Sequence, residues 1–320
     1  MDMLLVLTTS DDATADYLCR RLLDERLEFR RLDTDLLADN SFVEYRGHEV
    51  SLMVGDLRIH TNAIRNVWYR RPRGITIRGT GTEAHRLHTS REWGASLDGF
   101  LAAIPQSRWI NHPACNARAG NKLFQLSTAH RLGLRVPETI ITRSIQEAQN
   151  FYTSHEGGIV TKPLSTGHVE TLDGSVEAQI LTSSVGAEHL RDPALLAKCP
   201  TLLQERVTKG VDVRVTVIDR QICALTASPP SGGATPLDIR QDGMSDLLYE
   251  PVTLPPDVTA KLLSLCDYLQ LRFAAIDLVR SRYDEWFFLE INPNGQWAWL
   301  DLVGASDIAR LFITTFGAER

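Results

Sequence analysis

The feature that most constrains this chain is an apolar segment near its C-terminus, residues 287–292, which carries two oxygen-bearing side chains. Glu290 and Asn292 lie two positions apart. If the segment is a strand, both side chains lie on one face, because side chains alternate between faces along a strand. Pro293 and the turn sequence Asn294–Gly295 then end the strand. A carboxylate beside a carboxamide at a strand end suits Mg²⁺, which prefers oxygen ligands.

A second apolar segment, residues 273–279, precedes the first and carries one acid, Asp277. The polar residues 281–285 between the two segments are few enough for a hairpin loop, so we expect Asp277 to face Glu290 across the strand pair. The alternative is a half-buried edge strand with a solvated glutamate. We favour the paired arrangement, because an unpaired carboxylate within an apolar strand would be costly.

These residues carry a resemblance to a known family. An Asp on one strand and Glu-x-Asn on the next resemble the metal-binding end of the ATP-grasp carboxylate ligases. The longer sequence EINPNGQWAW, residues 290–299, resembles a narrower group, the ligases that macrocyclise ribosomal peptides (microviridin-type or graspetide synthetases). The resemblance implies an ATP-grasp fold with α/β and α+β lobes. Its domains would be an N-terminal pre-ATP-grasp domain (1–112), a central domain (113–204) and a C-terminal domain (205–320).

Composition excludes several other classes of protein. The chain has 320 residues, more than one typical domain, and its formal charge of −6 argues against a general nucleic-acid or membrane surface. Its five cysteines are scattered, without the CxxC spacing of a zinc site, and fit a reducing compartment. We find neither a signal-like segment nor an apolar run of membrane-spanning length. We therefore expect a cytoplasmic protein without nucleic-acid or membrane partners.

The N-terminal pattern indicates a small α/β lobe. Residues 4–7 and 27–32 are predicted strands flanking a helix, and three alternating segments over residues 41–59 predict an antiparallel meander. Residues 83–104 predict a helix whose apolar positions, beginning with Leu87, face the core.

The segment Trp68-Tyr69-Arg70-Arg71-Pro72 places two arginines directly after two aromatics. Arginine grips a carboxylate through two parallel hydrogen bonds, so this segment could bind a planar anion. Composition alone would favour a solvated basic loop. A W-x-R-R-P sequence also occurs here in the peptide-macrocyclising ligases, which favours Arg70 and Arg71 as substrate contacts.

The resemblance also implies a nucleotide site. Read alone, Lys122 is a lysine on a helix surface, and Glu205 could equally be an exposed strand residue. Lys162 ends an apolar strand, where lysine is rarely buried without an anion, so a role in the site and a position at the rim are both open. The loop after Lys162 could cover phosphates with its backbone N–H groups. The strand near residue 205 would pair with adenine and hold the ribose. The implied nucleotide contacts are Lys122, Lys162, Ser165, Thr166, Gly167, Gln204, Glu205 and Val207.

The resemblance likewise implies the catalytic and metal-binding residues. Arg214 would stabilise the transferred phosphoryl group or the acyl phosphate, and Arg240 would be a further catalytic anion contact. Asp212 and Arg214 could instead form a surface ion pair. Asp277, Glu290 and Asn292 would hold Mg²⁺, two ions in the family.

The function implied is ATP-dependent ligation. Asp or Glu side chains of a ribosomal precursor peptide, which has a leader and a core, would be activated as acyl phosphates and joined to Ser/Thr hydroxyls or Lys amines. Homodimers are common among such enzymes. One alternative is a ligase of the same fold acting on a small amino acid or a protein terminus. Another is a nucleotide-binding regulatory protein that never turns over.

Overall fold

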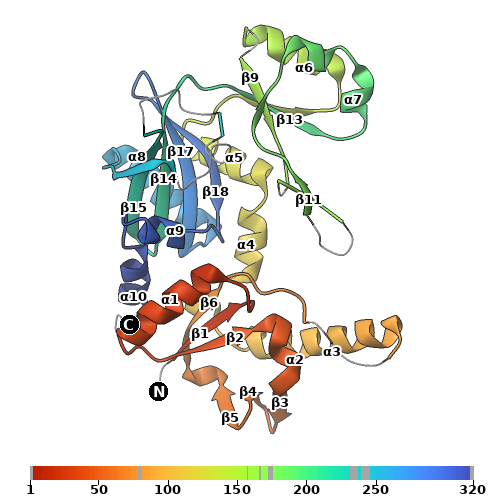
Figure 1. Ribbon diagram of the computed structural model, residues 1–320, viewed down its shortest axis with the longest axis vertical. Coiled ribbons are helices and arrows are strands. Elements are labelled where there is room, and N and C mark those ends of the chain that lie inside the picture. The colour runs from red at the N-terminus through yellow and green to blue at the C-terminus, as the bar shows by residue number, and fades with distance from the viewer. Residues whose placement is uncertain are drawn as a thin grey trace.

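The computed structural model describes residues 3–75, 77, 81–156, 158–165, 167–171, 176–230, 237–238 and 246–317. Within these residues the chain forms three lobes in sequence order, joined by a pair of helices that runs between them (Figure 1). The mixed α/β and α+β class expected from the sequence is confirmed. No helix in the described ranges has the length and apolarity needed to cross a membrane.

The N-terminal lobe combines a parallel sheet, of strand order β2-β1-β6-β7, with a three-stranded antiparallel sheet, β3-β4-β5. The apolar run Leu4–Leu7 lies in the centre of the parallel sheet and is buried. Its helices (η for short 3₁₀ helices) and strands are β1 (Met3–Thr8), α1 (Ala13–Asp24), β2 (Phe29–Asp33), η1 (Thr34–Leu36), α2 (Leu37–Asn40), β3 (Ser41–Arg46), β4 (Glu49–Val54), β5 (Leu57–His60), η2 (Thr61–Ala63), β6 (Ile64–Tyr69), α3 (Glu83–Ala102), η3 (Gln106–Arg108) and β7 (Trp109–Ile110).

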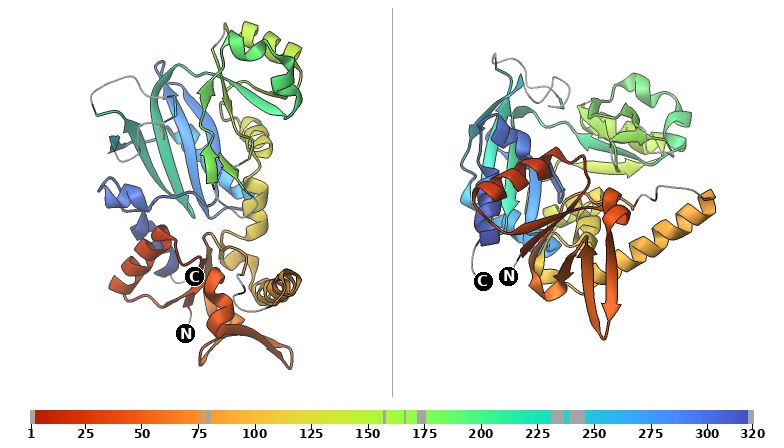
Figure 2. Two further views of the ribbon diagram at one scale, coloured as in Figure 1. Left: turned by 45° about the vertical axis from the view of Figure 1, so that its right-hand side comes forward. Right: turned by 60° about the horizontal axis from the view of Figure 1, so that its bottom comes forward.

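Two sequence predictions for this lobe have different outcomes. The predicted meander is confirmed as β3, β4 and β5. The predicted helix forms as α3, but the expectation that Leu87 faces the core is wrong, since its side chain is 51% exposed. The first half of α3 extends away from the lobe (Figure 2), and only its second half, which includes Leu97 and Phe100, packs in the core.

The central lobe has a four-stranded antiparallel sheet of order β12-β9-β13-β8 and a separate hairpin, β10-β11. Its core, which includes Phe151, Ile159 and Leu203, is distinct from the cores of the other lobes. The elements are β8 (Thr139–Thr142), α6 (Ile145–Ser154), β9 (Ile159–Lys162), β10 (His168–Glu170), β11 (Val176–Gln179), β12 (Ser183–Ser184), η4 (Ala187–Leu190), α7 (Pro193–Ala197) and β13 (Thr201–Glu205).

The C-terminal lobe is built on a five-stranded antiparallel sheet of order β16-β15-β14-β17-β18. Its elements are β14 (Lys209–Ile218), β15 (Gln221–Ser228), β16 (Leu248–Pro251), α8 (Pro256–Leu269), β17 (Phe273–Ser281), β18 (Trp286–Asn292), α9 (Ala298–Leu302) and α10 (Ile308–Gly317). The helices α4 (Pro113–Ala119) and α5 (Lys122–Arg131) share one core with α8 and this sheet. The predicted boundary at residue 113 is not tested by this packing and stays a prediction.

The N-terminal and C-terminal lobes share another continuous core. The ring of Phe312 on α10 lies 5.3 Å from that of Trp68 on β6 and 5.1 Å from that of Trp297, measured between ring centroids. The same cluster includes Leu18 of α1 and Phe273 of β17. This shared core holds the end of β6 against the segment that follows β18.

Candidate active site

Three charged side chains form a row across adjacent strands of the C-terminal sheet. Arg214 on β14 pairs in register with Asp277 on β17, which pairs in register with Glu290 on β18. The prediction that Asp277 faces Glu290 is therefore confirmed. The Arg214 Nη1 donates to Asp277 Oδ1 at 2.7 Å. The arginine thus contacts the acid directly beside it.

The end of β18 adds an amide oxygen to this row. Asn292 pairs with Ala275, and its Oδ1 accepts a hydrogen bond from the Asn294 backbone N–H at 2.9 Å. Among the described residues, no group of three or more His, Cys, Asp or Glu side chains could hold a metal by itself. Two carboxylates and one amide instead fit Mg²⁺, which is commonly bound by one or two carboxylates together with substrate phosphates.

Burial perturbs the acid at the centre of the row. Loss of solvent raises the pKa of Asp277, the nearby Arg214 guanidinium lowers it, and the neighbouring Glu290 carboxylate raises it again. Two carboxylates at one strand pair repel each other, so a cation placed between them would favour the ionised form of both. The electrostatics of this position therefore favour a bound cation.

Lys122, the first residue of α5, links two lobes at this site. Its Nζ donates to the Pro163 backbone oxygen at 2.6 Å and lies 3.7 Å from Glu290 Oε2. Because Pro163 follows β9, this one ammonium group contacts both the central lobe and the acidic row.

Lys162, the last residue of β9, is half-buried. Burial lowers the pKa of its ammonium group to about 8, an effect that the negative charges of Glu290 and Asp277 oppose. The positive charge of the neighbouring Lys122 lowers the pKa of Lys162 further. Lys162 is therefore in the electrostatic environment of the acidic row.

The loop after Lys162 is held close to another segment. The Gly167 oxygen accepts a hydrogen bond from the Ile180 N–H at 2.6 Å, and a Cβ at residue 167 would lie 2.8 Å from the Ile180 oxygen. A side chain at this position would clash with backbone, so glycine is required. Ser165 is exposed, and Thr166 lies outside the described residues.

The residues predicted to contact the adenine and ribose have partners within the central lobe. The Gln204 side chain is buried and donates to Thr139 Oγ1 at 2.8 Å, whereas Glu205 accepts from the Glu138 N–H at 3.2 Å. Val207 is half-buried just after β13. The structure gives the Gln204 side chain a role in joining β13 to β8, and the nucleotide contacts of these residues stay predictions.

Asp212 has a different partner from the one that the sequence suggested. Its carboxylate pairs with Lys209 Nζ at 2.8 Å, while Arg214 pairs with Asp277. Burial raises the pKa of Asp212 to about 6, although the Lys209 charge lowers it. Lys209 also donates to the Leu237 oxygen.

The sequence Asp-x-Arg at residues 238–240, which contains the predicted catalytic residue Arg240, is described only in part. Asp238 is buried and accepts a hydrogen bond from the Thr182 N–H at 3.0 Å. Arg240, the other residue of that sequence, lies outside the described residues.

Arg70 and Arg71 come from the N-terminal lobe yet reach the end of β18. Arg70 is 1% exposed, its Nη1 donates to the Asn294 oxygen, and its Nε lies 3.5 Å from Asp12 Oδ2. Arg71 is exposed, and its Nη2 donates to the same Asn294 oxygen at 3.4 Å. The structure thus brings both arginines to the loop that follows Asn292, with only Arg71 open to solvent.

Comparisons with known proteins agree with this geometry. Residues 2–117 match the family model described as the MvdD pre-ATP grasp domain. No curated protein gives a significant match. The macrocyclase MdnC from Microcystis aeruginosa MRC, solved with precursor peptide MdnA, is 26% identical with a TM-score of 0.81, and the alignment covers 99% of each chain.

Two further solved structures cover nearly the whole chain. A Chryseobacterium gregarium RiPP-associated ATP-grasp ligase, solved with ADP and a leader and core peptide, is 25% identical with a TM-score of 0.86, covering 100% of this chain and 98% of its own. The macrocyclase MdnB from Microcystis aeruginosa MRC is 26% identical with a TM-score of 0.77, covering 100% of both chains.

The fold, the acidic row and these similarities define an ATP-grasp ligase with an N-terminal pre-ATP-grasp domain. Within that class, the chain is similar to the macrocyclases MdnC and MdnB and to the RiPP-associated ligase from Chryseobacterium gregarium.

Proposed function

We propose that this enzyme uses ATP and Mg²⁺ to activate Asp or Glu side chains of a ribosomal precursor peptide and joins them to Ser/Thr hydroxyls or Lys amines of the same peptide. The observation that carries the proposal is the row Arg214–Asp277–Glu290, which lies across three adjacent strands beside Lys122. Acids that can hold a cation and bases that can hold phosphate meet there. The precursor peptides and the ADP found in the relatives support the choice of substrate and cofactor.

The side chains of the site would form two groups, one that binds metal and one that binds the nucleotide phosphates. Asp277, Glu290 and Asn292 would hold two Mg²⁺ ions, while Lys122 and Lys162 would contact the nucleotide phosphates. Mg·ATP would supply the phosphoryl group, and ADP would be the leaving group. The ion pairs Arg214–Asp277 and Lys122–Glu290 now neutralise these charges within the protein. Binding of Mg²⁺ and phosphate would exchange both pairs for ligand contacts, so metal and nucleotide should bind more tightly together than separately.

The chemistry requires no covalent enzyme nucleophile. A peptide carboxylate oxygen forms a bond to the γ-phosphorus while the bond to ADP breaks. A hydroxyl or amine then attacks the carbonyl carbon, phosphate leaves, and a proton is released. Arg214 would stabilise the charge on the transferred phosphoryl group, and Arg240 has the same proposed role. Arg71, exposed beside the end of β18, would hold the peptide carboxylate through its planar fork.

The test is mass spectrometry of a candidate precursor peptide, encoded beside this gene and rich in Thr/Glu or Ser/Asp, after incubation with enzyme, ATP and Mg²⁺. We expect the loss of one water for each ring formed, with matching ADP release. The Asp277→Asn variant is the control and should give neither product. ADP release that depends on a small amino acid but not on the peptide would contradict the proposed substrate.

A further inference from the structure

The loop of residues 293–296 joins the proposed metal-binding strand β18 to α9. Residues that lie outside the β17–β18 hairpin hold this loop in place. Asn111 Nδ2 donates to the Pro293 oxygen at 3.0 Å. With its amide nitrogen turned toward the nearest acceptors, Asn294 donates to the backbone oxygens of Tyr69 and Arg70 at 3.1 and 3.2 Å. The end of β6 therefore binds this loop through its backbone.

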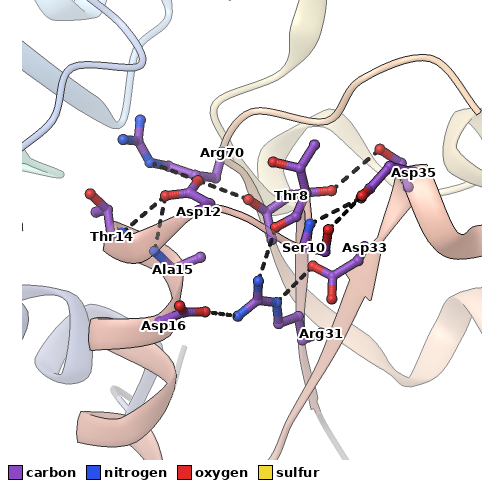
Figure 3. A network of polar contacts seen from close by, with 12 residues as sticks. Thr8, Ser10, Asp12, Thr14, Ala15, Asp16, Arg31, Asp33, Asp35 and Arg70 are labelled. Atoms are coloured by element: carbon purple, nitrogen blue, oxygen red, sulfur yellow. Dashed lines mark hydrogen bonds and ion pairs between the residues drawn. The ribbon is translucent and has the colours of Figure 1, made fainter.

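Arg70 adds a side-chain contact to the same loop. Its guanidinium is buried and donates through Nη1 to the Asn294 oxygen, while Nε faces Asp12. In Figure 3 the guanidinium extends away from the N-terminal lobe, beyond the Asp12 carboxylate. Arg70 thus spans the space between a fixed acid in one lobe and a backbone oxygen in another.

Asp12 is a suitable anchor because Arg70 is not needed to hold it. Its carboxylate accepts from Thr8 Oγ1 at 2.8 Å and, as the N-cap of α1, from the Thr14 and Ala15 N–H groups at 3.0 and 3.2 Å (Figure 3). These partners all belong to β1 and α1. The position of this carboxylate is therefore fixed by the N-terminal lobe alone.

The other end of the loop contacts Arg214. The Gln296 backbone oxygen accepts from Arg214 Nη2 at 3.1 Å. A Cβ at Gly295 would lie 2.9 Å from the same Nη2 and 2.3 Å from the Ala275 Cβ. The loop is thus packed directly against the guanidinium that pairs with Asp277, and a shift of the loop would move that group.

Stability alone does not explain a buried arginine here. Within the described residues, Nε and Nη2 of Arg70 have no hydrogen-bond partner. Burial lowers its pKa to about 10, so the group still carries its charge at neutral pH. A buried charge with incomplete hydrogen bonding contributes little net stability, because the cost of desolvation offsets the attraction.

We propose that Arg70 is a positioning residue for the active site: anchored by Asp12, it fixes loop 293–296 and, through that loop, the guanidinium of Arg214. The role of Arg214 in phosphoryl transfer rests on the proposed function, whereas the fixing of the loop does not. Arg71 differs from Arg70, because it is exposed and remains available to substrate.

The first experiment measures hydrogen exchange in the ligand-free protein. In Arg70→Met, the amides of residues 294–300 should exchange about tenfold faster, because the loop loses its clamp, while α1 stays protected by its Asp12 cap. Arg73→Gln is the matched control, since Arg73 is also in the N-terminal lobe but pairs with Asp11 at the surface. Unchanged exchange in Arg70→Met, or an equal increase throughout the chain, would overturn the proposal.

The second experiment is a double-mutant cycle on the affinity for Mg·AMPPNP, with Arg70→Met and Arg214→Lys. If Arg70 acts through Arg214, each single change should weaken binding about tenfold and the double change little more than either. Independent effects, giving about a hundredfold loss in the double variant, would refute this coupling. Arg70→Lys, which keeps the charge without the planar fork, replaces Arg70→Met if the methionine variant fails to fold.

These two experiments separate the proposals. A protein that does not bind Mg·AMPPNP at all would contradict the proposed function, and the exchange measurement would still decide whether Arg70 fixes the loop.

Discussion

Two arginine–aspartate pairs contact loop 293–296, and they differ in how their acids are satisfied. In the pair Arg70–Asp12 the side chains are 2% and 7% exposed, and the acid has three further hydrogen bonds within its own lobe. In the pair Arg214–Asp277 they are 16% and 33% exposed, and the acid faces a second carboxylate, Glu290. The hydrogen bonds and charge of Asp12 are satisfied by the protein alone, whereas Asp277 and Glu290 together carry negative charge that a cation can balance. The same pair of residue types is therefore structural in one lobe and suited to ligand binding in the other.

The largest effect should come from removing negative charge at Asp277, in the pair Arg214–Asp277, or at the neighbouring Glu290. We expect Asp277→Asn or Glu290→Ala to lower turnover about 10³-fold, because each loses a negative charge that holds Mg²⁺. The melting temperature should change little, since both side chains are only half-buried. Activity close to that of the unchanged enzyme in either variant would show that the metal assignment is wrong.

Removing the acid of the pair Arg70–Asp12 should instead lower the free energy of unfolding. Asp12→Ala removes the N-cap of α1 and leaves Arg70 buried without its anion, so we expect a loss of about 3 kcal/mol in the free energy of unfolding. Urea denaturation measures this loss. Asp11→Ala, at the neighbouring exposed position, is the control and should change stability little, because Asp11 forms only a surface ion pair with Arg73. Equal costs at the two positions would remove the distinction between the pairs.

A smaller effect is expected at Lys162. Lys162→Met keeps the stem and removes the charge, so affinity for Mg·AMPPNP should fall about tenfold while stability is kept. Calorimetric titration and thermal melting report the two quantities. Normal nucleotide affinity with a clearly lower melting temperature would make Lys162 a structural residue.

The pH dependence gives an independent check on Lys162. Its folded-state pKa of about 8 lies below the ordinary lysine value of 10.5, so the unfolded chain binds more protons between these values. Stability should therefore rise with pH over this interval. Phosphate binding favours the charged form, so nucleotide affinity should weaken as pH rises through about 8. Both trends should be absent in Lys162→Met.

The smallest effect is expected at the exposed arginine. Arg71→Ala should raise KM for the peptide by about three- to fivefold and leave nucleotide affinity unchanged, because exposed charge contacts are worth little. Arg71→Lys should restore KM poorly, since lysine lacks the planar fork. Steady-state kinetics at saturating ATP measure this effect. A KM for peptide that does not change in Arg71→Ala would remove this arginine from substrate binding.

Local patterns predicted the centre of the site well. The hairpin of β17 and β18, with Asp277 facing Glu290, follows from two apolar segments and a short polar loop. In contrast, the sequence could not show that Arg70 is buried and Arg71 exposed. That difference depends on Asn294, 224 positions from Arg70, and on Asp12.

One expectation and one alternative interpretation failed, because the periodicity of a segment does not show which neighbouring elements its side chains contact. The spacing in α3 includes Leu87, but only the second half of the helix packs in the core. The alternation in β14 suggested an Asp212–Arg214 pair along one strand. Arg214 instead pairs with Asp277 on the neighbouring strand, where in-register side chains are directly opposite.

The core shared by the N-terminal and C-terminal lobes determines which parts of the enzyme can move. Phe312 packs against both Trp68 and Trp297, so separating these two lobes would expose large aromatic surfaces to water. The central lobe keeps its own core around Phe151 and Leu203. We therefore expect the N-terminal and C-terminal lobes to move together as one rigid unit and the central lobe to move as a second. The central lobe would open and close over a rigid base, with the Lys122–Pro163 hydrogen bond as one contact across the moving boundary.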